Sequence, residues 1–458
     1  MAKDLCYFLK EIEGKHPDLL LRVTEEVNPN HFEITALLSL LEKKGHEKMV
    51  LFEKALSMDG KAHIPLLFNV FSSRSLCALA LNLARADQYM GLVEEFAKRE
   101  DSQGHVELVP ESEAPCQETV WKGDAVSLLK LPVPMHHQKD VGPYLTMTCI
   151  MKGLGQDFYD ITFTKNMVKG HKRMSVSAHP HHHLEAILAE YEMKKLKAPI
   201  VVVLGHHPAF YLSSCCITPF GNNDYLTASS FLKEPLRLTP SRTWGKDFLV
   251  PADAEIIIEA EIIPSLREIQ NPFGEIAGYY QGEMSMPVAE VTAITMKKGP
   301  VMQGVFPGHP EHWNLGGIPK EGSVYSVIKR NIPGVRAIHL PPSGCGRFSC
   351  NISLKKEFEG EPRKAAMAAY TEMPNLKLAV VVDEDVDVYN EQEVQWAVVT
   401  RTHWDKDLEV IRKIQTFRSW LGDAVAIIDA TRPKGVNFPE KNEIPREALL
   451  KAQKKWNL

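Results

Sequence analysis

Residues 144–308 constrain the fold most strongly, because short apolar runs alternate with turns throughout this segment. Each run has the length of one strand, and together they cover residues 145–151, 174–177, 200–204, 255–263 and 288–296. Several short strands separated by turn residues are typical of an antiparallel sheet or a barrel. We therefore predict a strand-rich central domain whose sheet is mainly antiparallel.

The region before this segment has a mixed α/β pattern. Leu5 and Ile12 share one face of a predicted helix, which Asp4 caps and Gly14 ends. The other predicted elements are helices at residues 32–44 and 75–98 and a strand at residues 49–52. Residues 101–142 are rich in polar residues and proline, which indicates a connector.

The α/β alternation returns after about residue 323. A buried strand is predicted at residues 379–382, and helices are predicted at residues 391–401 and 446–456. The last helix carries Leu449, Leu450 and Trp456. We expect these side chains to pack on a neighbouring subunit.

Composition is that of an ordinary soluble globular chain, with 44% apolar and 24% charged residues among 458. The formal net charge of −5 gives no electrostatic reason to expect a nucleic acid or a membrane as partner. The strongest apolar run, residues 200–204, is far shorter than the ~20 residues of a membrane-spanning helix. The charged amino terminus is unlike a signal peptide, and the eight cysteines form no CxxC pair. We therefore expect a cytoplasmic protein.

One loop presents a candidate acid. Glu275 follows Pro272, Phe273 and Gly274 directly, at the end of the apolar run that begins near residue 255. A carboxylate held on a tight turn beside an aromatic ring is well placed to transfer protons. The alternative is an ordinary solvated glutamate.

Four histidines lie within five positions, at His179, His181, His182 and His183. A solvated polar loop is one interpretation of this cluster. The other is a metal site, which would need acidic partners from elsewhere in the chain. Asp160 and Asp224 are the candidates, on loops that border the strand-rich segment, and such ligands suit Mg²⁺ or Mn²⁺.

Several common motifs are incomplete or missing in this sequence. The acidic run at residues 383–387 lacks the glycine and the glutamate of a calcium loop, since Val388 and Val394 occupy those positions. It is better interpreted as the polar end of a buried strand. The chain has no Walker A motif, no GxSxG and no complete dinucleotide fingerprint.

Ordered segments of the chain resemble the UbiD family of reversible decarboxylases. The segments are LVPADAEIIIEAEI, NPFGEIAGYY, KLAVVVDEDVDVYNEQEVQWAVVTR and IIDATRPK, with DLCYFLKEIE and SSRSLCALAL before them. The resemblance implies an α/β protein in three parts. These are an N-terminal α/β region (residues 1–120), a split-barrel, flavin-reductase-like domain that binds prenylated FMN (121–320), and a C-terminal α/β oligomerisation domain with a terminal helix (321–458).

The implied activity is non-oxidative, reversible decarboxylation of an aromatic or heteroaromatic acid with prenylated FMN. The implied ions are Mn²⁺ or Mg²⁺, with K⁺ as a further candidate. The implied partners are a small aromatic acid, CO₂, a flavin prenyltransferase that supplies the cofactor, and further copies of the chain in a dimer or hexamer, with or without other subunits.

The resemblance also assigns a cofactor and metal region. Asp160 stands where the family has asparagine and Lys165 where it has arginine, and the strand between them, Ile161, Thr162, Phe163 and Thr164, faces the cofactor. His183 matches the metal histidine, with His182 beside it near the cofactor. Asp224 matches an acidic metal ligand that is usually glutamate. The implied metal ligands are therefore Asp160, His183 and Asp224.

The catalytic turn matches the family in part. Glu275 corresponds to the retained acid, which is implied to protonate carbon after CO₂ leaves, and Gln270 stands where the family has a second glutamate. Lys165 is implied to offset the charge of the substrate carboxylate. Lys377 matches a lysine near the flavin phosphate. Arg347 is a candidate for binding a second acidic group on the substrate, and a structural role is the alternative.

The departures from the family pattern conserve charge. Asp160 adds one negative charge, Gln270 removes one, and Lys165 and Asp224 change none. We interpret this as a transfer of one negative charge from the proton-transfer network to the metal shell. Independent drift in an inactive paralogue is the alternative.

Two other functions stay open at this stage. One is a carboxylase subunit of a multi-component enzyme for anaerobic degradation of aromatic compounds. The other is a non-catalytic subunit that stabilises an active relative.

Overall fold

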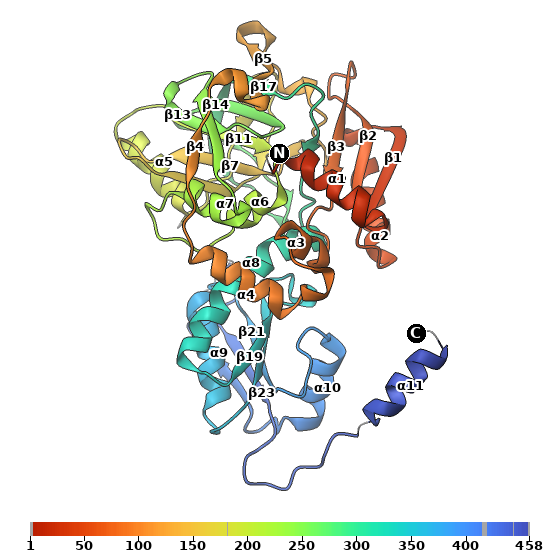
Figure 1. The fold of residues 1–458 in the computed structure, drawn as a ribbon. Helices are drawn as coiled ribbons and strands as arrows, with labels where there is room; N and C mark the ends of the chain where they lie inside the picture. Colours follow the sequence, from red (N-terminus) through yellow and green to blue (C-terminus); the bar gives the residue numbers. More distant parts are fainter. Residues whose placement is uncertain (1–2, 181, 415–418, 443, 457–458) are drawn as a thin grey trace.

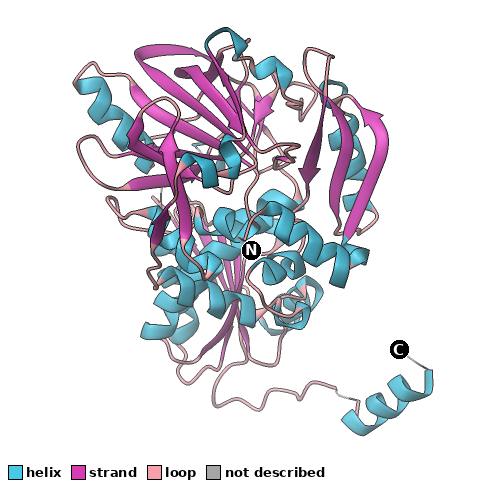
Figure 2. Ribbon diagram, turned by 45° about the horizontal axis from the view of Figure 1, so that its top comes forward, coloured by secondary structure: helices cyan, strands magenta, loops and turns pink. Residues whose placement is uncertain are grey.

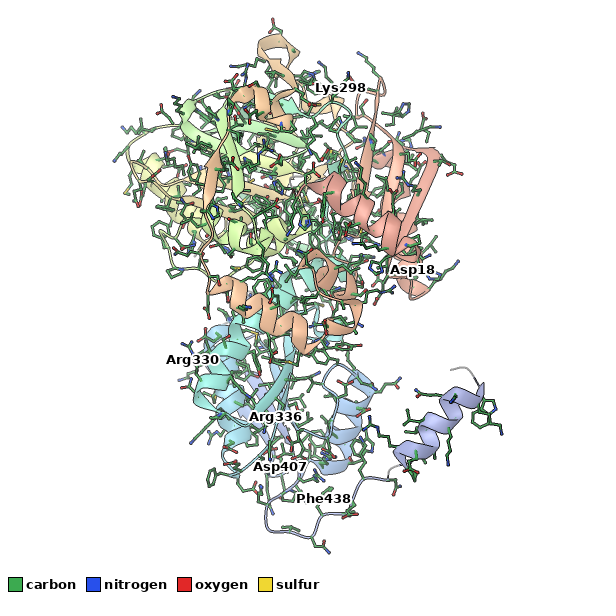
Figure 3. The ribbon with its side chains drawn as sticks, viewed as in Figure 1. Asp18, Lys298, Arg330, Arg336, Asp407 and Phe438 are labelled. Carbon is green, nitrogen blue, oxygen red and sulfur yellow. The ribbon has the colours of Figure 1, made fainter. Side chains whose placement is uncertain are left out.

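The computed structural model describes residues 3–180, 182–414, 419–442 and 444–456. It divides into an N-terminal sheet, a larger central sheet and a separate C-terminal sheet, with helices α4 (Met90–Glu100) and α8 (Pro310–Asn331) lying between the upper and lower parts (Figure 1). Charged side chains such as Asp18, Lys298 and Arg330 point outwards (Figure 3). No helix in the described ranges is both long and apolar enough to cross a membrane.

The N-terminal sheet has the strand order β1-β2-β3-β18. Its strands are β1 (Leu20–Val27), β2 (Met49–Leu56), β3 (His63–Phe68) and β18 (Met302–Gln303). Helix α1 (Leu5–Lys15) begins as predicted, because the Asp4 side chain accepts a hydrogen bond of 2.7 Å from the backbone N–H of Tyr7. Helix α2 (Glu33–Lys43) is also confirmed.

The single helix predicted at residues 75–98 is wrong. The structure has two helices there, α3 (Arg74–Ala80) and α4, separated by a 3₁₀ turn at Arg85–Asp87. Asn82 adopts a left-handed conformation with φ of 59°, which ends the first helix. Asparagine tolerates this conformation better than most residues, and the helical periodicity around it concealed the break.

The central sheet confirms the predicted antiparallel pattern. Its order is β10-β17-β14-β11-β7-β8, with β5 (Thr119–Lys122) paired to β17, and every pairing is antiparallel. The strands are β7 (Thr148–Lys152), β8 (Tyr159–Phe163), β10 (Arg173–Ser175), β11 (Ala198–Leu204), β14 (Ile256–Ile269) and β17 (Ser285–Met296). Among the described strands, β8 and β10 end this order and do not pair with each other.

The predicted connector contributes strands of its own. Besides β5, it supplies β4 (Val106–Leu108), which pairs in parallel with β12 (Leu236–Ser241), and β12 pairs with β13 (Gly245–Pro251). The remainder of the connector is mainly 3₁₀ turns and irregular chain. Polar, proline-rich composition therefore concealed short pairings that only long-range contacts form.

The C-terminal sheet has the order β19-β20-β21-β23-β22, and its three central strands are parallel. The strands are β19 (Val335–His339), β20 (Ser349–Leu354), β21 (Leu378–Asp383), β22 (Leu408–Ile411) and β23 (Val425–Ala430). Helices α9 (Glu361–Glu372) and α10 (Glu391–Arg401) lie on either side of it (Figure 1). The boundary predicted at residue 320 falls inside α8, which runs from the central part into this one.

The tail helix α11 (Arg446–Trp456) is confirmed at its predicted bounds and stands apart from the body of the chain (Figures 1 and 2). None of its residues is buried. Its large apolar side chains are half exposed or more: Leu449 50%, Leu450 56% and Trp456 61%. Within the described part of one chain, no side chain of this helix is buried.

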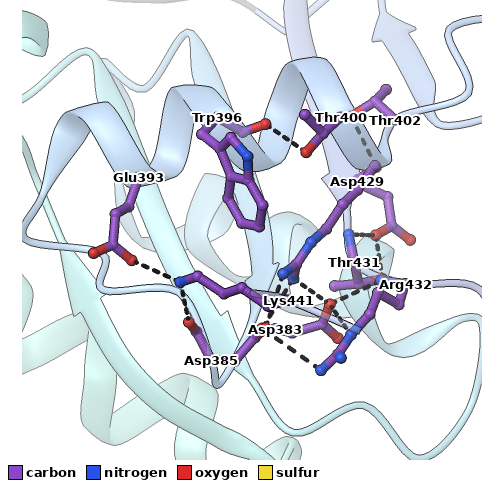
Figure 4. A network of polar contacts seen from close by, with 11 residues as sticks. Asp383, Asp385, Glu393, Trp396, Thr400, Thr402, Asp429, Thr431, Arg432 and Lys441 are labelled. Atoms are coloured by element: carbon purple, nitrogen blue, oxygen red, sulfur yellow. Dashed lines mark hydrogen bonds and ion pairs between the residues drawn. The ribbon is translucent and has the colours of Figure 1, made fainter. Parts of the chain in front are cut away.

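An ion-pair network closes the carboxyl ends of β21 and β23 (Figure 4). Arg401 of α10 donates to Asp383 at 2.8 Å and to both oxygens of Asp385 at 2.9 and 2.8 Å. Arg432 lies 3.4 Å from Asp383, and Lys441 lies 3.4 Å from Glu393. The acidic run is thus the polar end of a buried strand, as predicted, and the carboxylates of Asp383 and Asp385 are neutralised by Arg401 and Arg432.

Replacing Arg401 with methionine should lower the free energy of unfolding by about 3 kcal/mol, because it leaves largely buried carboxylates short of a cation. Urea unfolding followed by tryptophan fluorescence would measure this, since the Arg401 guanidinium lies 4.9 Å from the Trp396 ring centre. The control is Arg363→Met, which breaks a more exposed pair with Glu409 and should cost less than about 1 kcal/mol. Equal losses in the two variants would contradict the role assigned to the network.

Candidate active site

A buried ion pair joins the end of β8 to the turn that follows β14. Lys165, two residues after β8, donates from Nζ to Oε1 of Glu275. Glu275 is only 4% exposed, and the Lys165 ammonium lies 5.5 Å from the ring centre of Phe273. The structure therefore brings together two predicted catalytic residues that lie 110 positions apart.

The backbone of the catalytic turn, residues 270–281, is closely held around Glu275. Strands β15 (Phe273–Gly274) and β16 (Tyr280–Gln281) form a two-residue ladder. The N–H of Glu275 donates to the carbonyl of Tyr279 at 2.9 Å, and the carbonyl of Glu275 accepts from Gly278 at 2.9 Å. Trp313 of α8 donates from its indole to the carbonyl of Ile276 at 2.9 Å.

Gln270 lies at the start of this turn and is 2% exposed. Its side-chain N–H₂ donates to the hydroxyl of Ser177, and its backbone carbonyl accepts from the hydroxyl of Tyr144. Its side-chain carbonyl oxygen is buried without a hydrogen-bond partner. A neutral amide at this position cannot exchange a proton with Glu275.

A second group of side chains gathers at the other end of β8. Asp160 Oδ1 lies 3.2 Å from Nδ1 of His183, the first residue of α5 (His183–Met193). Asp224, the first residue of α7 (Asp224–Leu232), accepts a hydrogen bond of 2.9 Å from the N–H of Ile161. The sequence had suggested loops for both acids, which is wrong, because Asp160 lies within β8 and Asp224 within α7.

The electrostatics of this group follow from burial and charge. The hydrogen bond to the Asp160 carboxylate raises the pKa of His183. Burial, and then the nearby carboxylate of Asp160, raises the pKa of Asp224 to about 6. A cation placed between these side chains would relieve the repulsion between the two carboxylates.

Strand β8 links the two groups. Asp160 and Lys165 flank the predicted cofactor-facing residues Ile161, Thr162, Phe163 and Thr164. Thr164 is 5% exposed and its hydroxyl lies 2.8 Å from the sulfur of Cys149 on β7. Because Asp160 lies on β8 and Lys165 only two residues after its end, this short segment sets the spacing between the Asp160, His183 and Asp224 group and the Lys165–Glu275 pair.

Comparison with known proteins identifies the family. Three models match successive parts of the chain: the N-terminal domain of 3-octaprenyl-4-hydroxybenzoate carboxy-lyase at residues 14–96, its Rift-related domain at 107–310 and its C-terminal domain at 313–419. The chain belongs to the UbiD family. The predicted resemblance is thereby confirmed.

Individual UbiD relatives cover most of the chain. Anhydromevalonate phosphate decarboxylase of Methanothermobacter thermautotrophicus is 30% identical over 292 residues, which is 64% of this chain and 68% of that protein. HmfF of Pelotomaculum thermopropionicum, solved with FMN, is 32% identical with a TM-score of 0.89, over 96% of this chain and 97% of that one. An evolved dimeric form of HmfF, solved with prFMN, is 32% identical with a TM-score of 0.87, over 98% of both chains.

Vanillic acid decarboxylase of Sedimentibacter hydroxybenzoicus, in its open form, is a further similar structure. It is 25% identical with a TM-score of 0.85, over 99% of both chains. The α/β fold of this chain is therefore that of UbiD-class structures.

The histidine cluster of this UbiD chain lies beside the acid group. His182 is at the N-cap position of α5, and the rings of His179 and His182 are 6.3 Å apart, whereas His181 lies outside the described residues. Desolvation, followed by the cations of Arg347 and Lys320, lowers the pKa of His182. The neutral form of this histidine is favoured in consequence.

Arg347 lies in the loop after β19 and approaches α8. A side-chain carbon built on Gly316 would lie 3.1 Å from the Arg347 guanidinium and 3.8 Å from Ile276, the residue after Glu275. Lys320, one turn further along α8, was missed by the sequence analysis because nothing distinguished it from other lysines. Burial, and then Arg347, lowers the pKa of Lys320 to about 8.

Lys377 is not brought to either group. It precedes β21 in the C-terminal sheet, and its ammonium donates to the backbone carbonyl of Ala424, with the carbonyl of Gly422 at 3.4 Å. A match by position along the chain could not reveal that neighbouring carbonyls already bind this lysine. Within one chain, the arrangement gives no support to the predicted contact with a flavin phosphate.

The fit of a divalent cation rests on Asp160, His183 and Asp224. Across the described ranges, no group of three or more His, Cys, Asp or Glu side chains is already arranged as a metal centre. One oxygen of Asp160 is, however, buried without a hydrogen-bond partner, as a ligand atom awaiting a cation would be. Two carboxylates and one imidazole are a donor set suited to Mg²⁺ or Mn²⁺.

The raised pKa of Asp224 has a consequence for stability. In the folded chain Asp224 keeps its proton up to about pH 6, whereas an unfolded aspartate loses it near pH 4. The folded state therefore binds more protons in this window, and the contribution of Asp224 to the free energy of unfolding falls as pH rises from about 4 to about 6.

The variant Asp224→Asn should remove this decline. Without divalent cations, its free energy of unfolding relative to the original chain should increase from about pH 4 to about pH 6 and then stay constant, as measured by urea unfolding across that range. The control is Asp157→Asn, whose side chain is 98% exposed, and it should show no such trend. Parallel pH profiles for Asp224→Asn and the original chain would contradict the burial argument.

Proposed function

We propose that this chain is a carboxy-lyase that releases CO₂ from an aromatic or heteroaromatic carboxylic acid, reversibly and without oxidation, with prenylated FMN as cofactor. The observation that carries the proposal is the buried Lys165–Glu275 pair, held one strand-length from the Asp160, His183 and Asp224 group. Support for the cofactor comes from HmfF, which was solved with FMN and with prFMN.

Prenylated FMN, when bound, supplies an electron sink for the carbon that loses CO₂. On this proposal Asp160, His183 and Asp224 hold a Mn²⁺ or Mg²⁺ ion that neutralises the cofactor phosphate. The unpaired oxygen of Asp160 and the mutual repulsion of the two carboxylates support this assignment. The residues between Asp160 and Lys165 would then run along the cofactor.

Lys165 binds the substrate carboxylate and Glu275 transfers the proton. The substrate carboxylate competes with Glu275 for the Lys165 ammonium. A buried glutamate that loses its counter-charge favours its protonated form, so substrate binding itself prepares Glu275 as an acid. After CO₂ leaves, Glu275 delivers its proton to the vacated carbon and its carboxylate returns to Lys165. Lysine, unlike arginine, provides a single mobile point charge for this exchange.

Gln270 has a supporting role in this scheme. Its hydrogen bond to Ser177 and the bond from Tyr144 hold the start of the catalytic turn. Because its amide does not titrate, Glu275 is the one acid of the pair at positions 270 and 275.

Arg347 and Lys320 favour a substrate with a second anionic group. Burial, and then the charge of Arg347, lowers the pKa of Lys320. Lys320 lies one turn after Gly316 on α8, and Arg347 approaches Gly316 from the loop after β19. Glu100 provides some opposing charge to Lys320. A carboxylate or phosphate bound between the two cations would relieve their repulsion.

The proposed partners follow from the fold and the relatives. The apolar face of α11 has no cover within one chain, which supports a homo-oligomer, and an evolved HmfF is dimeric. A flavin prenyltransferase would supply the cofactor. The carboxylase-subunit and stabilising-subunit alternatives are not favoured, because the relatives are decarboxylases and the Lys165–Glu275 pair is intact.

The central test is Glu275→Gln, made in cells that also produce prenylated FMN. With a panel of aromatic acids in heavy water, deuterium incorporation at the departing position should fall by about 10²–10⁴-fold, because proton delivery is lost. The visible spectrum of bound cofactor should be unchanged. The control is the exposed Glu283→Gln on the same loop, which should keep full activity. Undiminished exchange in Glu275→Gln would remove Glu275 from the mechanism.

The second-anion proposal is tested with Arg347→Met. The KM for an accepted acid bearing a second carboxylate or phosphate should rise by about 10–100-fold, because a charge-assisted hydrogen bond to that group is lost. The KM for the matching acid without the second anionic group should change less than threefold. Arg336→Met, an exposed arginine of the same part of the chain, serves as control. Equal effects on both acids would reject the assignment.

A further inference from the structure

Asp140 is a fully buried carboxylate that binds the catalytic turn. Its side chain is 0% exposed, and its Oδ1 accepts a hydrogen bond of 2.9 Å from the backbone N–H of Gly274, the residue before Glu275. Its Oδ2 accepts a hydrogen bond of 2.9 Å from the N–H of His137 and lies 3.6 Å from the Nδ1 atom of the same residue. Both oxygens are therefore used.

The segment around Asp140 forms a cradle for this turn. Val141 donates to the carbonyl of Pro272 at 3.2 Å, and the N–H of Lys139 donates to the hydroxyl of Tyr280 at 3.1 Å. The ring of Tyr144 lies 4.2 Å from that of Phe273. The cradle, defined here as residues 136–144, thus contacts the turn both before and after Glu275.

The His137 ring fixes how closely the two segments approach. A side-chain carbon on Gly274 would lie only 2.2 Å from Nδ1 of His137, so no other residue fits at this position without displacing the ring. Glycine therefore allows the backbone of the turn to come within hydrogen-bond distance of the Asp140 carboxylate. The contact joins residues that lie 134 positions apart.

Two backbone hydrogen bonds of Glu275 are local. They run to Tyr279 and Gly278, within the turn itself, so they shape the turn without locating it relative to β8. The Asp140–Gly274 bond instead ties the peptide before Glu275 to a separate buried segment. A carboxylate acceptor forms a stronger bond to an N–H than a neutral acceptor does.

We propose that Asp140 is a positioning residue for the proton transfer, acting through the N–H of Gly274 to hold Glu275 within reach of Lys165 and the substrate. This inference rests on the proposed function. A displacement of about 1 Å at a reacting group can lower the rate about 10²-fold. Loss of the Asp140–Gly274 hydrogen bond should therefore lower kcat.

The test compares Asp140→Ala with Asp140→Asn in the holoenzyme. Alanine removes both acceptors and should lower kcat about 100-fold with KM changed less than threefold. Asparagine keeps one acceptor oxygen, so the kcat of Asp140→Asn should be about tenfold higher than that of Asp140→Ala. The control is Asp253→Ala, which removes a buried aspartate paired with Arg237 outside the site and should leave kcat within threefold.

Hydrogen–deuterium exchange provides a measurement that does not depend on activity. In Asp140→Ala, peptides covering residues 270–282 should exchange at least tenfold faster, while peptides covering β21 should be unchanged. Unaltered exchange of the turn, a kcat within threefold of the original chain, or an equal loss of kcat in the alanine and asparagine variants would each overturn the inference. An original chain inactive on every acid would instead reject the proposed function, and the exchange measurement would still decide whether Asp140 holds the turn.

Discussion

The candidate site depends on the ion pair between Lys165 and Glu275, which connects the segment after β8 with the turn after β14. Lys165 extends from the end of β8, a strand in the central sheet, and Glu275 from a turn that leaves the same sheet after β14. The pair is largely shielded from water, which strengthens the attraction between the two charges. On the proposed mechanism, a substrate anion that binds Lys165 would weaken its pair with Glu275, which would couple substrate binding to proton transfer.

Strand β8 sets the distance between the two centres of charge. Asp160, at its second position, faces His183 and Asp224, while Lys165 lies just beyond its last residue. The interpretation that one negative charge has moved from position 270 to position 160 stays a prediction. The geometry is consistent with it, because Gln270 is held as a neutral hydrogen-bonding group and Asp160 has an oxygen without a partner.

Much of the fold could be predicted from periodicity and turn residues. The antiparallel central sheet, helices α1 and α2, helix α10 and the tail helix follow from patterns within about 15 residues, where local backbone preferences dominate. The break at Asn82 could not be predicted, because one residue in a left-handed conformation interrupts an otherwise helical pattern. Lys377 shows the same limit for the site, since a motif match cannot reveal that its ammonium is bound by the carbonyls of Gly422 and Ala424.

By itself the sequence determined which chemical groups are available: a retained acid at Glu275, a lysine at position 165, two aspartates with a histidine, and an amide at position 270. Only the tertiary structure decided which of them meet. Glu275 pairs with Lys165, Gly274 with Asp140, and Arg347 with the Gly316 face of α8, in each case across a long separation along the chain. Contacts of this kind depend on sheet register and side-chain packing, which are properties of the whole fold rather than of any local segment.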